Sequence, residues 1–123
     1  MAVRTTLRAD ARSAAAARRF VADVLLQRGF PDGCIADAIL LTSEAVTYAI
    51  DLGGSAIGVQ VAAEPCMSRV EVHLLDRANA AGISSIPEPP SGTRLQVIQA
   101  LAEAWGVEPE GPRARFIWFE LRG

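Results

Sequence analysis

The feature that most constrains this chain is a pair of neighbouring segments in which every second residue is apolar. The apolar positions are Ile57, Val59 and Val61 in the first segment, and Val70, Val72 and Leu74 in the second. A period of two residues is typical of strands that bury one face and leave the other open. The connection between them is short, so we expect an antiparallel hairpin that turns at residues 65–68.

Two helices are expected before the hairpin, and they can cover its apolar face. The first is predicted to be capped by Asp10 or Ser13 and to run through about Arg28, with an apolar stripe on one side, and it ends at Gly29. After a turn at residues 31–33, the second is predicted over residues 35–52 and ends at Gly53. This helix is apolar around more than one face, which favours burial against a sheet.

The rest of the chain adds two strands, a helix and a long irregular segment. Strands are predicted over residues 3–7 and 115–121, and a helix over residues 93–105. Residues 77–92 are rich in Pro and Gly, and such long loops are uncommon and often functional, so we expect them to be mobile. The element order favours one α+β domain over residues 1–123. We expect a two-layer sandwich, with three helices on one face of a mostly antiparallel sheet of four or five strands.

Composition excludes several classes of protein. The 123 residues carry a formal net charge of −2 with a pI near 5.3, which gives no general attraction to nucleic acid. Cys34, Cys66 and His73 are too few, and too irregularly spaced, for a zinc site or a disulfide scaffold. No signal peptide is visible, and no apolar run approaches the roughly 20 residues of a membrane span. We therefore expect a cytoplasmic protein with no metal site of this kind, no membrane association and no nucleic-acid partner.

Three stretches in order resemble the motifs of the GHKL (Bergerat) ATPase fold, and in particular those of small bacterial anti-sigma-factor serine kinases. They are LLTSEAVTYAI at residues 40–50, VHLLDRANAAG at residues 72–82, and PSGTRLQVIQALAEAWGV at residues 90–107. FIWFEL at residues 116–121 is similar to the last strand of that family, so the resemblance covers nearly the whole chain. It implies a histidine-kinase-like ATPase domain with the α+β architecture described above.

The resemblance gives roles to individual residues. Glu44 matches the general base of the family, and Asp76 matches the Asp that receives the adenine amino group. Ser91 and Gly92 match the glycine-rich lid over the nucleotide. Tyr48 stands where the family has an Asn that helps to hold magnesium on ATP. Residues four apart on a helix face the same way, so Glu44 and Tyr48 should point into one pocket.

Three positions depart from the family pattern. A Tyr phenol is bulky and neutral at pH 7, and it is a poor replacement for an amide oxygen that binds magnesium. Ala78 and Arg94 replace glycines. Arg94 puts a positive side chain at a helix N-terminus, where backbone N–H groups would otherwise approach phosphates. Its guanidinium could still bind a phosphate directly, and Glu44 and Asp76 are retained.

Simpler structural roles are open for each of these side chains. Glu44 and Arg94 could be solvated helix residues, Tyr48 could serve packing alone, and Asp76 could cap a turn. The alternation of its strand places His73 with Arg69 and Glu71, so we expect it to be exposed. Trp105 and Trp118 are both expected in the core or in the shell around it.

Three functions follow from these observations. The first, which we favour, is a regulator of anti-sigma-factor type with a degenerate ATP site, which acts by binding a sigma factor, an anti-sigma antagonist or another signalling partner. The second is an active Mg-ATP-dependent serine kinase that phosphorylates an antagonist, and the third is a sensor that binds ATP or ADP without turnover. Loss of the metal-holding Asn weakens phosphoryl transfer most. Homodimerisation is open, and we expect Glu44 and Arg94 to compensate each other's charge beside Tyr48.

Overall fold

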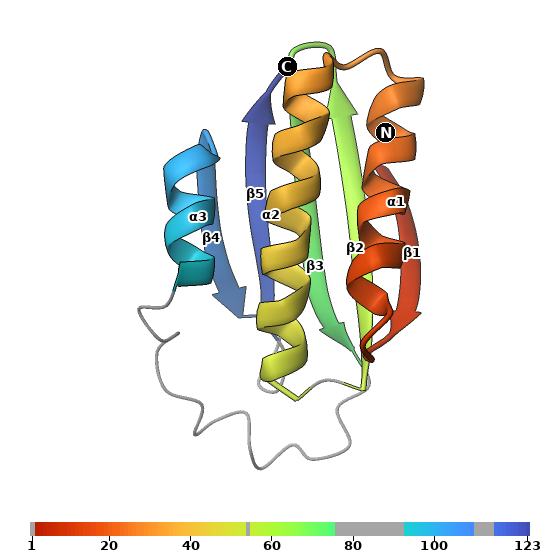
Figure 1. Cartoon of the computed structure of the whole chain (residues 1–123), viewed down its shortest axis with the longest axis vertical. Helices are drawn as coiled ribbons and strands as arrows, with labels where there is room; N and C mark the ends of the chain where they lie inside the picture. Colours follow the sequence, from red (N-terminus) through yellow and green to blue (C-terminus); the bar gives the residue numbers. More distant parts are fainter. Residues whose placement is uncertain (1, 54, 76–92, 110–114) are drawn as a thin grey trace.

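The computed structural model describes residues 2–53, 55–75, 93–109 and 115–123 (Figure 1). For residues 93 and 94 it describes the backbone only. Its five strands form one sheet in the order β1-β2-β3-β5-β4, and every neighbouring pair is antiparallel. The strands are β1 (Ala2–Arg8), β2 (Ala56–Glu64), β3 (Met67–Leu75), β4 (Ala104–Pro109) and β5 (Arg115–Arg122). β1 and β4 are thus the edges of the sheet, and β3 is its central strand.

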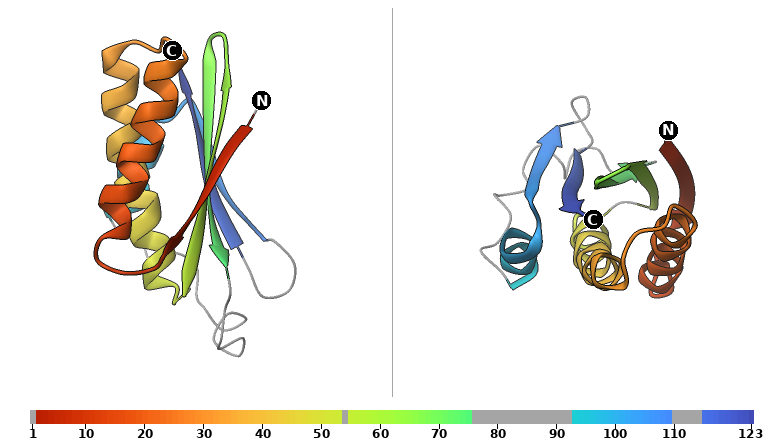
Figure 2. Two further views of the ribbon diagram at one scale, coloured as in Figure 1. Left: turned by 90° about the vertical axis from the view of Figure 1, so that its right-hand side faces the viewer. Right: turned by 90° about the horizontal axis from the view of Figure 1, so that it is seen from above.

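Three helices cover one face of this sheet, and all of them lie on the same side (Figure 2). They are α1 (Ser13–Gln27), α2 (Asp32–Asp51) and α3 (Thr93–Leu101). α2 lies between the other two, with α1 on the β1–β2 side and α3 on the β4 side (Figure 1). The predicted α+β sandwich, with three helices on one face of an antiparallel sheet, is therefore confirmed.

The core lies between the two layers and contains the residues that the alternation predicted. All six apolar positions of β2 and β3 are buried, from Ile57 at 0% exposed to Leu74 at 3%. The largest fully buried side chains on the other elements are Phe119, Leu25, Leu41, Ile98 and Ile117. Burial of one such side chain stabilises the fold by about 1.5–3 kcal/mol relative to its exposure. The predicted hairpin is present, with Glu64 paired to Met67, so its turn is shorter than expected.

The start of α2 differs from the prediction. The sequence Pro31-Asp32-Gly33 indicated a turn before a helix at residue 35, but the helix already begins at Asp32. Pro31 is the N-cap residue in an extended conformation, with φ −65° and ψ 154°. A proline at a helix start gives up no helical hydrogen bond, and the carboxylate of Asp32 favours the positive end of the helix dipole. After the helix, Gly53 has φ 90°, which a side chain would strain.

The predicted helix over residues 93–105 was wrong over its last four residues. α3 ends at Leu101, and the chain then forms the strand β4. Trp105 pairs with Phe119, and Val107 pairs with Ile117, along β5. The apolar spacing that indicated a longer helix instead supplies side chains that pack against the core from an edge strand.

Helix α2 also departs from the expectation that no segment is apolar over the length of a membrane span. Among the described residues it is the one helix long and apolar enough to cross a membrane, with 20 residues and a mean hydropathy of 1.3. Core helices pass the same test, and 44% of its most apolar window is buried against the rest of the protein. Length and composition alone therefore do not make it a span. The expectations for residues 77–92 lie outside the described residues.

Candidate functional site

Helix α2 presents three different sides to the protein. Ala45 is fully buried and faces the sheet. On the flank toward α1, Ser43 Oγ accepts a hydrogen bond of 2.8 Å from Nη1 of Arg18. Successive helical residues turn by about 100°, so Glu44 and Tyr48 lie on the other flank, which is the side where α3 packs (Figure 1).

The two residues on this flank have different surroundings. Tyr48 is 5% exposed and belongs to the hydrophobic core. Glu44, one turn earlier, is half-buried. The side chains thus share a direction but not an environment. Burial of an aromatic ring of this size contributes strongly to packing.

The donor set at this position does not fit the magnesium contact that the sequence resemblance implies. An amide oxygen at residue 48 could bind a hard cation, but the structure places there a buried phenol that is neutral at pH 7. Glu44 remains as a carboxylate beside it. The described part of this flank therefore carries a half-buried carboxylate at residue 44 and a buried phenol at residue 48, and the general-base role of Glu44 stays a prediction.

The other residues expected at the site cannot be placed beside these two. Asp76, Ser91 and Gly92, and the family departure Ala78, lie outside the described residues. The backbone of Arg94 lies in the first turn of α3, which packs against α2, and its side chain is outside the description. Of the sequence-predicted set, the structure therefore brings together Glu44 and Tyr48.

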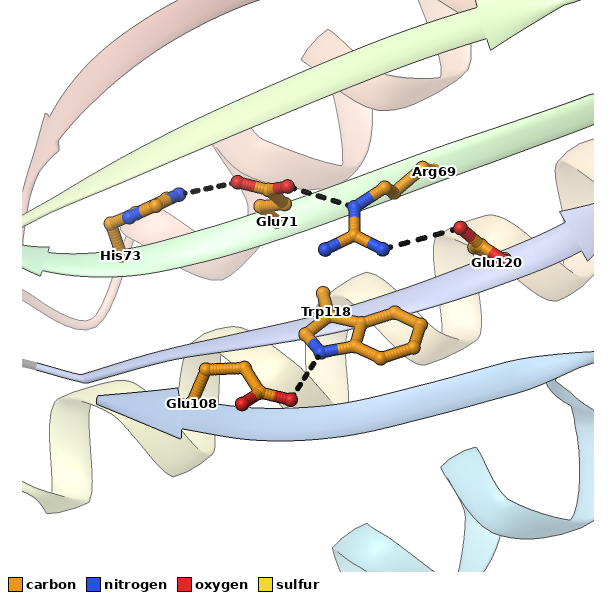
Figure 3. A network of polar contacts seen from close by, with 6 residues as sticks. All are labelled: Arg69, Glu71, His73, Glu108, Trp118 and Glu120. Atoms are coloured by element: carbon orange, nitrogen blue, oxygen red, sulfur yellow. Dashed lines mark hydrogen bonds and ion pairs between the residues drawn. The ribbon is translucent and has the colours of Figure 1, made fainter. Parts of the chain in front are cut away.

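A second cluster of polar residues lies on the face of the sheet opposite the helices, and the sequence reasoning missed it (Figure 3). The Glu71 carboxylate accepts a hydrogen bond of 2.8 Å from Nε of Arg69, and its other oxygen lies 2.8 Å from Nε2 of His73. Nη1 of Arg69 also reaches the Glu120 carboxylate at 3.2 Å. These contacts link β3 to β5 through charged side chains that are only partly exposed.

Aromatic rings complete this cluster. The Arg69 guanidinium lies over the Trp118 ring, 4.2 Å from its centroid, in a cation–π contact. Trp118 Nε1 donates a hydrogen bond of 3.1 Å to the Glu108 carboxylate on β4. The His73 ring stacks on Phe116 with a centroid distance of 4.6 Å and an interplanar angle of 15°. We call the six residues drawn in Figure 3, together with Phe116, the sheet-face network.

The network shifts the pKa values of Glu71 and Arg69. Burial alone would raise the pKa of Glu71, but hydrogen bonds from Arg69 and His73 and their charges lower this pKa below its usual value. Burial would lower the pKa of Arg69, and its contacts with Glu71 and Glu120 outweigh that effect and raise it. Both shifts favour the charged forms, so the pair is an ion pair at neutral pH.

His73 corrects the expectation of an exposed histidine. The alternation placed it on the correct face, beside Arg69 and Glu71, but it is only 5% exposed. Phe116 covers one side of its ring, and Glu71 holds its Nε2. Trp105 packs against the core as expected. The expectation was wrong for Trp118, which lies with Glu71 on the face of the sheet that points away from the core. The signal for the network was the shared alternation of residues 69–73 and 116–120, once the two strands are known to pair.

Comparison with known proteins tests the fold. No family model matches the chain, and no curated protein matches it. The RsbW-containing structure of the RsbU and RsbW domains of Rv1364c from Mycobacterium tuberculosis matches 99% of this chain, with 20% identity and a TM-score of 0.72. The chain spans 32% of the length of that structure. The structure of the SiaB–SiaC complex from Pseudomonas aeruginosa matches 98% of this chain and 89% of its own, with 12% identity and a TM-score of 0.60.

The chain has the GHKL fold. At these identities the likeness concerns the fold, and it agrees with the resemblance that the motifs around Glu44 and residues 72–107 indicated. The fold positions α2 and α3 side by side over the sheet, with the flank of Glu44 and Tyr48 between them. Both matches extend over almost the whole of this chain, 99% and 98% of its length.

Proposed function

We propose that this chain is a cytoplasmic signalling regulator of anti-sigma-factor type, which acts mainly by binding another protein and has a degenerate ATP site. The observation that carries the proposal is Tyr48. It fills part of the core at the position where the resemblance expects a magnesium-holding Asn. A domain that retains the fold but lacks this contact can still present a shaped surface to a partner. The partner would be a sigma factor or an anti-sigma antagonist.

The matched structures support this proposal in one respect. One of them is a complex between two proteins, SiaB and SiaC, and the other joins an RsbW domain to an RsbU domain. In both, a domain with this fold occurs with other protein domains. A role in protein–protein signalling is therefore consistent with the fold, whereas an ATP-dependent reaction would need residues that this chain has replaced.

Nucleotide binding is the property that tests the proposal. We expect the melting temperature of the wild-type protein to be unchanged by excess Mg-ATP, because the proposed degenerate site does not bind it. The measurement is sensitive, since a ligand that binds and is present at a hundredfold its Kd would add about 2.7 kcal/mol to the stability. The double variant Tyr48→Asn, Arg94→Gly restores the family residues at two positions. A Mg-ATP-dependent rise in melting temperature for that variant alone would show that these two substitutions closed the site.

Phosphoryl transfer gives a second, independent test. Incubation of the wild-type protein with labelled ATP and candidate antagonist proteins should give no more labelling than a control without the protein. Robust transfer that is lost in Glu44→Ala would contradict the proposal and identify a working serine kinase. The assay has a built-in control, because Glu44→Ala removes only the carboxylate in the general-base position.

A nucleotide sensor is the second candidate, and one observation favours it. Glu44 is half-buried on the flank that faces α3, where a carboxylate with no role would be costly to retain. A wild-type thermal shift with ATP or ADP, without any phosphoryl transfer, would select the sensor over the binding protein. Magnesium dependence would then separate a nucleotide held through its metal from one held by the base and sugar.

A further inference from the structure

A cavity lies where strand β1 ends and helix α1 begins, at one end of the two layers (Figure 2). Its volume is about 380 Å³, which lies within the roughly 300–1,000 Å³ of sites for single small molecules. The residues that line it are Leu7, Arg8, Asp10, Arg12, Ser13 and Ala16. Helix α1 packs on the side of α2 away from α3, so the cavity is separate from the flank of Glu44 and Tyr48 (Figure 1).

The lining of this cavity changes from its interior to its rim. Ser13 is 3% exposed, and Leu7 and Ala16 are half-buried. The interior is therefore mostly apolar, with one hydroxyl. The remaining three lining residues are charged and exposed, so they form the rim. Such a lining, apolar inside with a few polar groups at fixed places, is typical of a small-molecule site.

The turn between β1 and α1 supplies hydrogen-bond acceptors. Asp10 Oδ1 accepts a hydrogen bond of 2.8 Å from the backbone N–H of Arg12, while Oδ2 has no such partner among the described residues. Ser13 Oγ donates a hydrogen bond of 2.6 Å to the Asp10 carbonyl. A hydroxyl has one proton to donate, so Oγ can only accept from a ligand. Both side chains thus suit a cationic N–H donor.

The two arginines of the rim supply the opposite charge. In the part of the chain that the structure describes, neither the Arg8 nor the Arg12 guanidinium is paired with a carboxylate. A guanidinium binds a carboxylate through two parallel hydrogen bonds. An anion alone would bring its charge close to that of Asp10, whereas a zwitterion matches the positive and the negative parts of the rim together.

We propose that this cavity binds a free α-amino acid with an apolar side chain. The α-carboxylate binds the two guanidinium groups of the rim, and the α-ammonium donates to Asp10 Oδ2 and Ser13 Oγ. The apolar side chain lies against Leu7 and Ala16. Every lining residue then contacts a group of matching chemistry. The bound amino acid joins the end of β1 to the start of α1, which is a role beyond the proposed protein-binding function.

A comparison of ligands on the wild-type protein tests the match of charges. Isothermal titration calorimetry with leucine, valine and methionine should show binding of at least one of them. For leucine, the analogues are 4-methylpentanoate, which lacks the ammonium group, and 3-methylbutylamine, which lacks the carboxylate. Each should bind about tenfold more weakly or worse, because each loses hydrogen bonds to a charged group. The proposal is overturned if none of the three amino acids binds, or if both analogues bind as tightly as leucine.

Substitutions on the rim assign the two charges separately. Asp10→Asn keeps an oxygen that can accept from the Arg12 N–H but removes the negative charge. It should weaken leucine about tenfold without weakening 4-methylpentanoate. Arg12→Ala should weaken both ligands about tenfold or more. Arg19→Ala removes the same charge from an exposed position of α1 outside the cavity, so it should change neither affinity.

The variants also give results that would contradict the proposal. Equal losses in Arg12→Ala and Arg19→Ala would indicate general attraction to a basic surface instead of a site. Wild-type affinity for leucine in Asp10→Asn would remove the ammonium contact. The variant Tyr48→Asn, Arg94→Gly should bind leucine as the wild type does, because neither residue lines the cavity. The amino-acid site and the proposed regulatory function can therefore be rejected independently of each other.

Discussion

The guanidinium of Arg69 lies 4.2 Å from the centre of the Trp118 ring, so a charged residue of the central strand rests on an aromatic residue of its neighbour. The same guanidinium is held by carboxylates on both sides, Glu71 at 2.8 Å and Glu120 at 3.2 Å. Its position is therefore fixed by three contacts. A face of the sheet that lacks helices is ordered instead by its own side chains.

This contact predicts a measurable coupling between the two residues. In a double-mutant cycle of Arg69→Met and Trp118→Leu, read by urea unfolding, we expect a coupling free energy of about 0.5–1 kcal/mol. The control cycle pairs Trp118→Leu with Arg122→Met. Arg122 lies on the same strand as Trp118 and has its own partner in Glu103. Additive effects in the first cycle, as in the control, would mean that the stacking contributes nothing.

The lowered pKa of Glu71 predicts a loss of stability in acid. The folded protein binds the Glu71 proton less readily than the unfolded chain does, because Arg69 and His73 hold the carboxylate. The stabilisation is therefore present above the unfolded value near 4.5, and it is lost as the pH falls through the lower folded value. In urea unfolding, Glu71→Gln should be less stable than the wild type at neutral pH, and the difference should shrink in acid.

A matched carboxylate makes the acid prediction specific. Asp23 is an exposed residue of α1 that lies away from the network. Asp23→Asn should keep the wild-type dependence of unfolding free energy on pH. If Glu71→Gln instead runs parallel to the wild type from neutral pH to about pH 3, the network does not contribute through this ionisation.

Thr42 is a buried residue that predicts a stabilising substitution. It is 0% exposed on α2, and among the described residues its Oγ1 has no hydrogen-bond partner. A buried hydroxyl without a partner is destabilising, so Thr42→Val should raise the free energy of unfolding by about 1 kcal/mol. Thr47→Val is the control, because Oγ1 of Thr47 donates a hydrogen bond of 2.8 Å to the Ser43 carbonyl. A Thr42→Val protein no more stable than wild type would mean that its hydroxyl is satisfied.

Local patterns were sufficient for most of the fold but not for β4. The alternation around Val59 and Val72 lies within short continuous stretches of sequence, and it predicted the hairpin. The apolar stretch of α2 is also continuous in sequence, and it predicted that helix. The helical spacing that includes Trp105 also continues past Leu101, yet the chain there pairs with β5. That pairing joins Trp105 to Phe119, and no local pattern contains it.

The site was predictable where a motif alone defines it. The positions of Glu44 and Tyr48 on one flank follow from their spacing on a helix, and the sequence showed both. The burial of His73 was not predictable, because it depends on Phe116, which lies far along the chain. Alternation assigns a residue to a face of a sheet, whereas exposure on that face depends on which side chains the neighbouring strands supply.

The final prediction concerns how the chain accommodates Glu44 without a metal partner. Glu44 is half-buried on the flank of α2 that faces α3, and Arg94 lies in the first turn of that neighbouring helix. We expect the two charges to compensate each other, directly or through water, because each alone would be costly in a partly buried pocket. A double-mutant cycle of Glu44→Gln and Arg94→Gly, read by urea unfolding, should give a coupling of about 2 kcal/mol. Gln96→Gly introduces a glycine at an exposed position of α3 without removing a charge, and it should be additive with Glu44→Gln. Additivity in both cycles would show that Arg94 does not replace the lost metal contact, and Glu44 would then have to be stabilised by some other group.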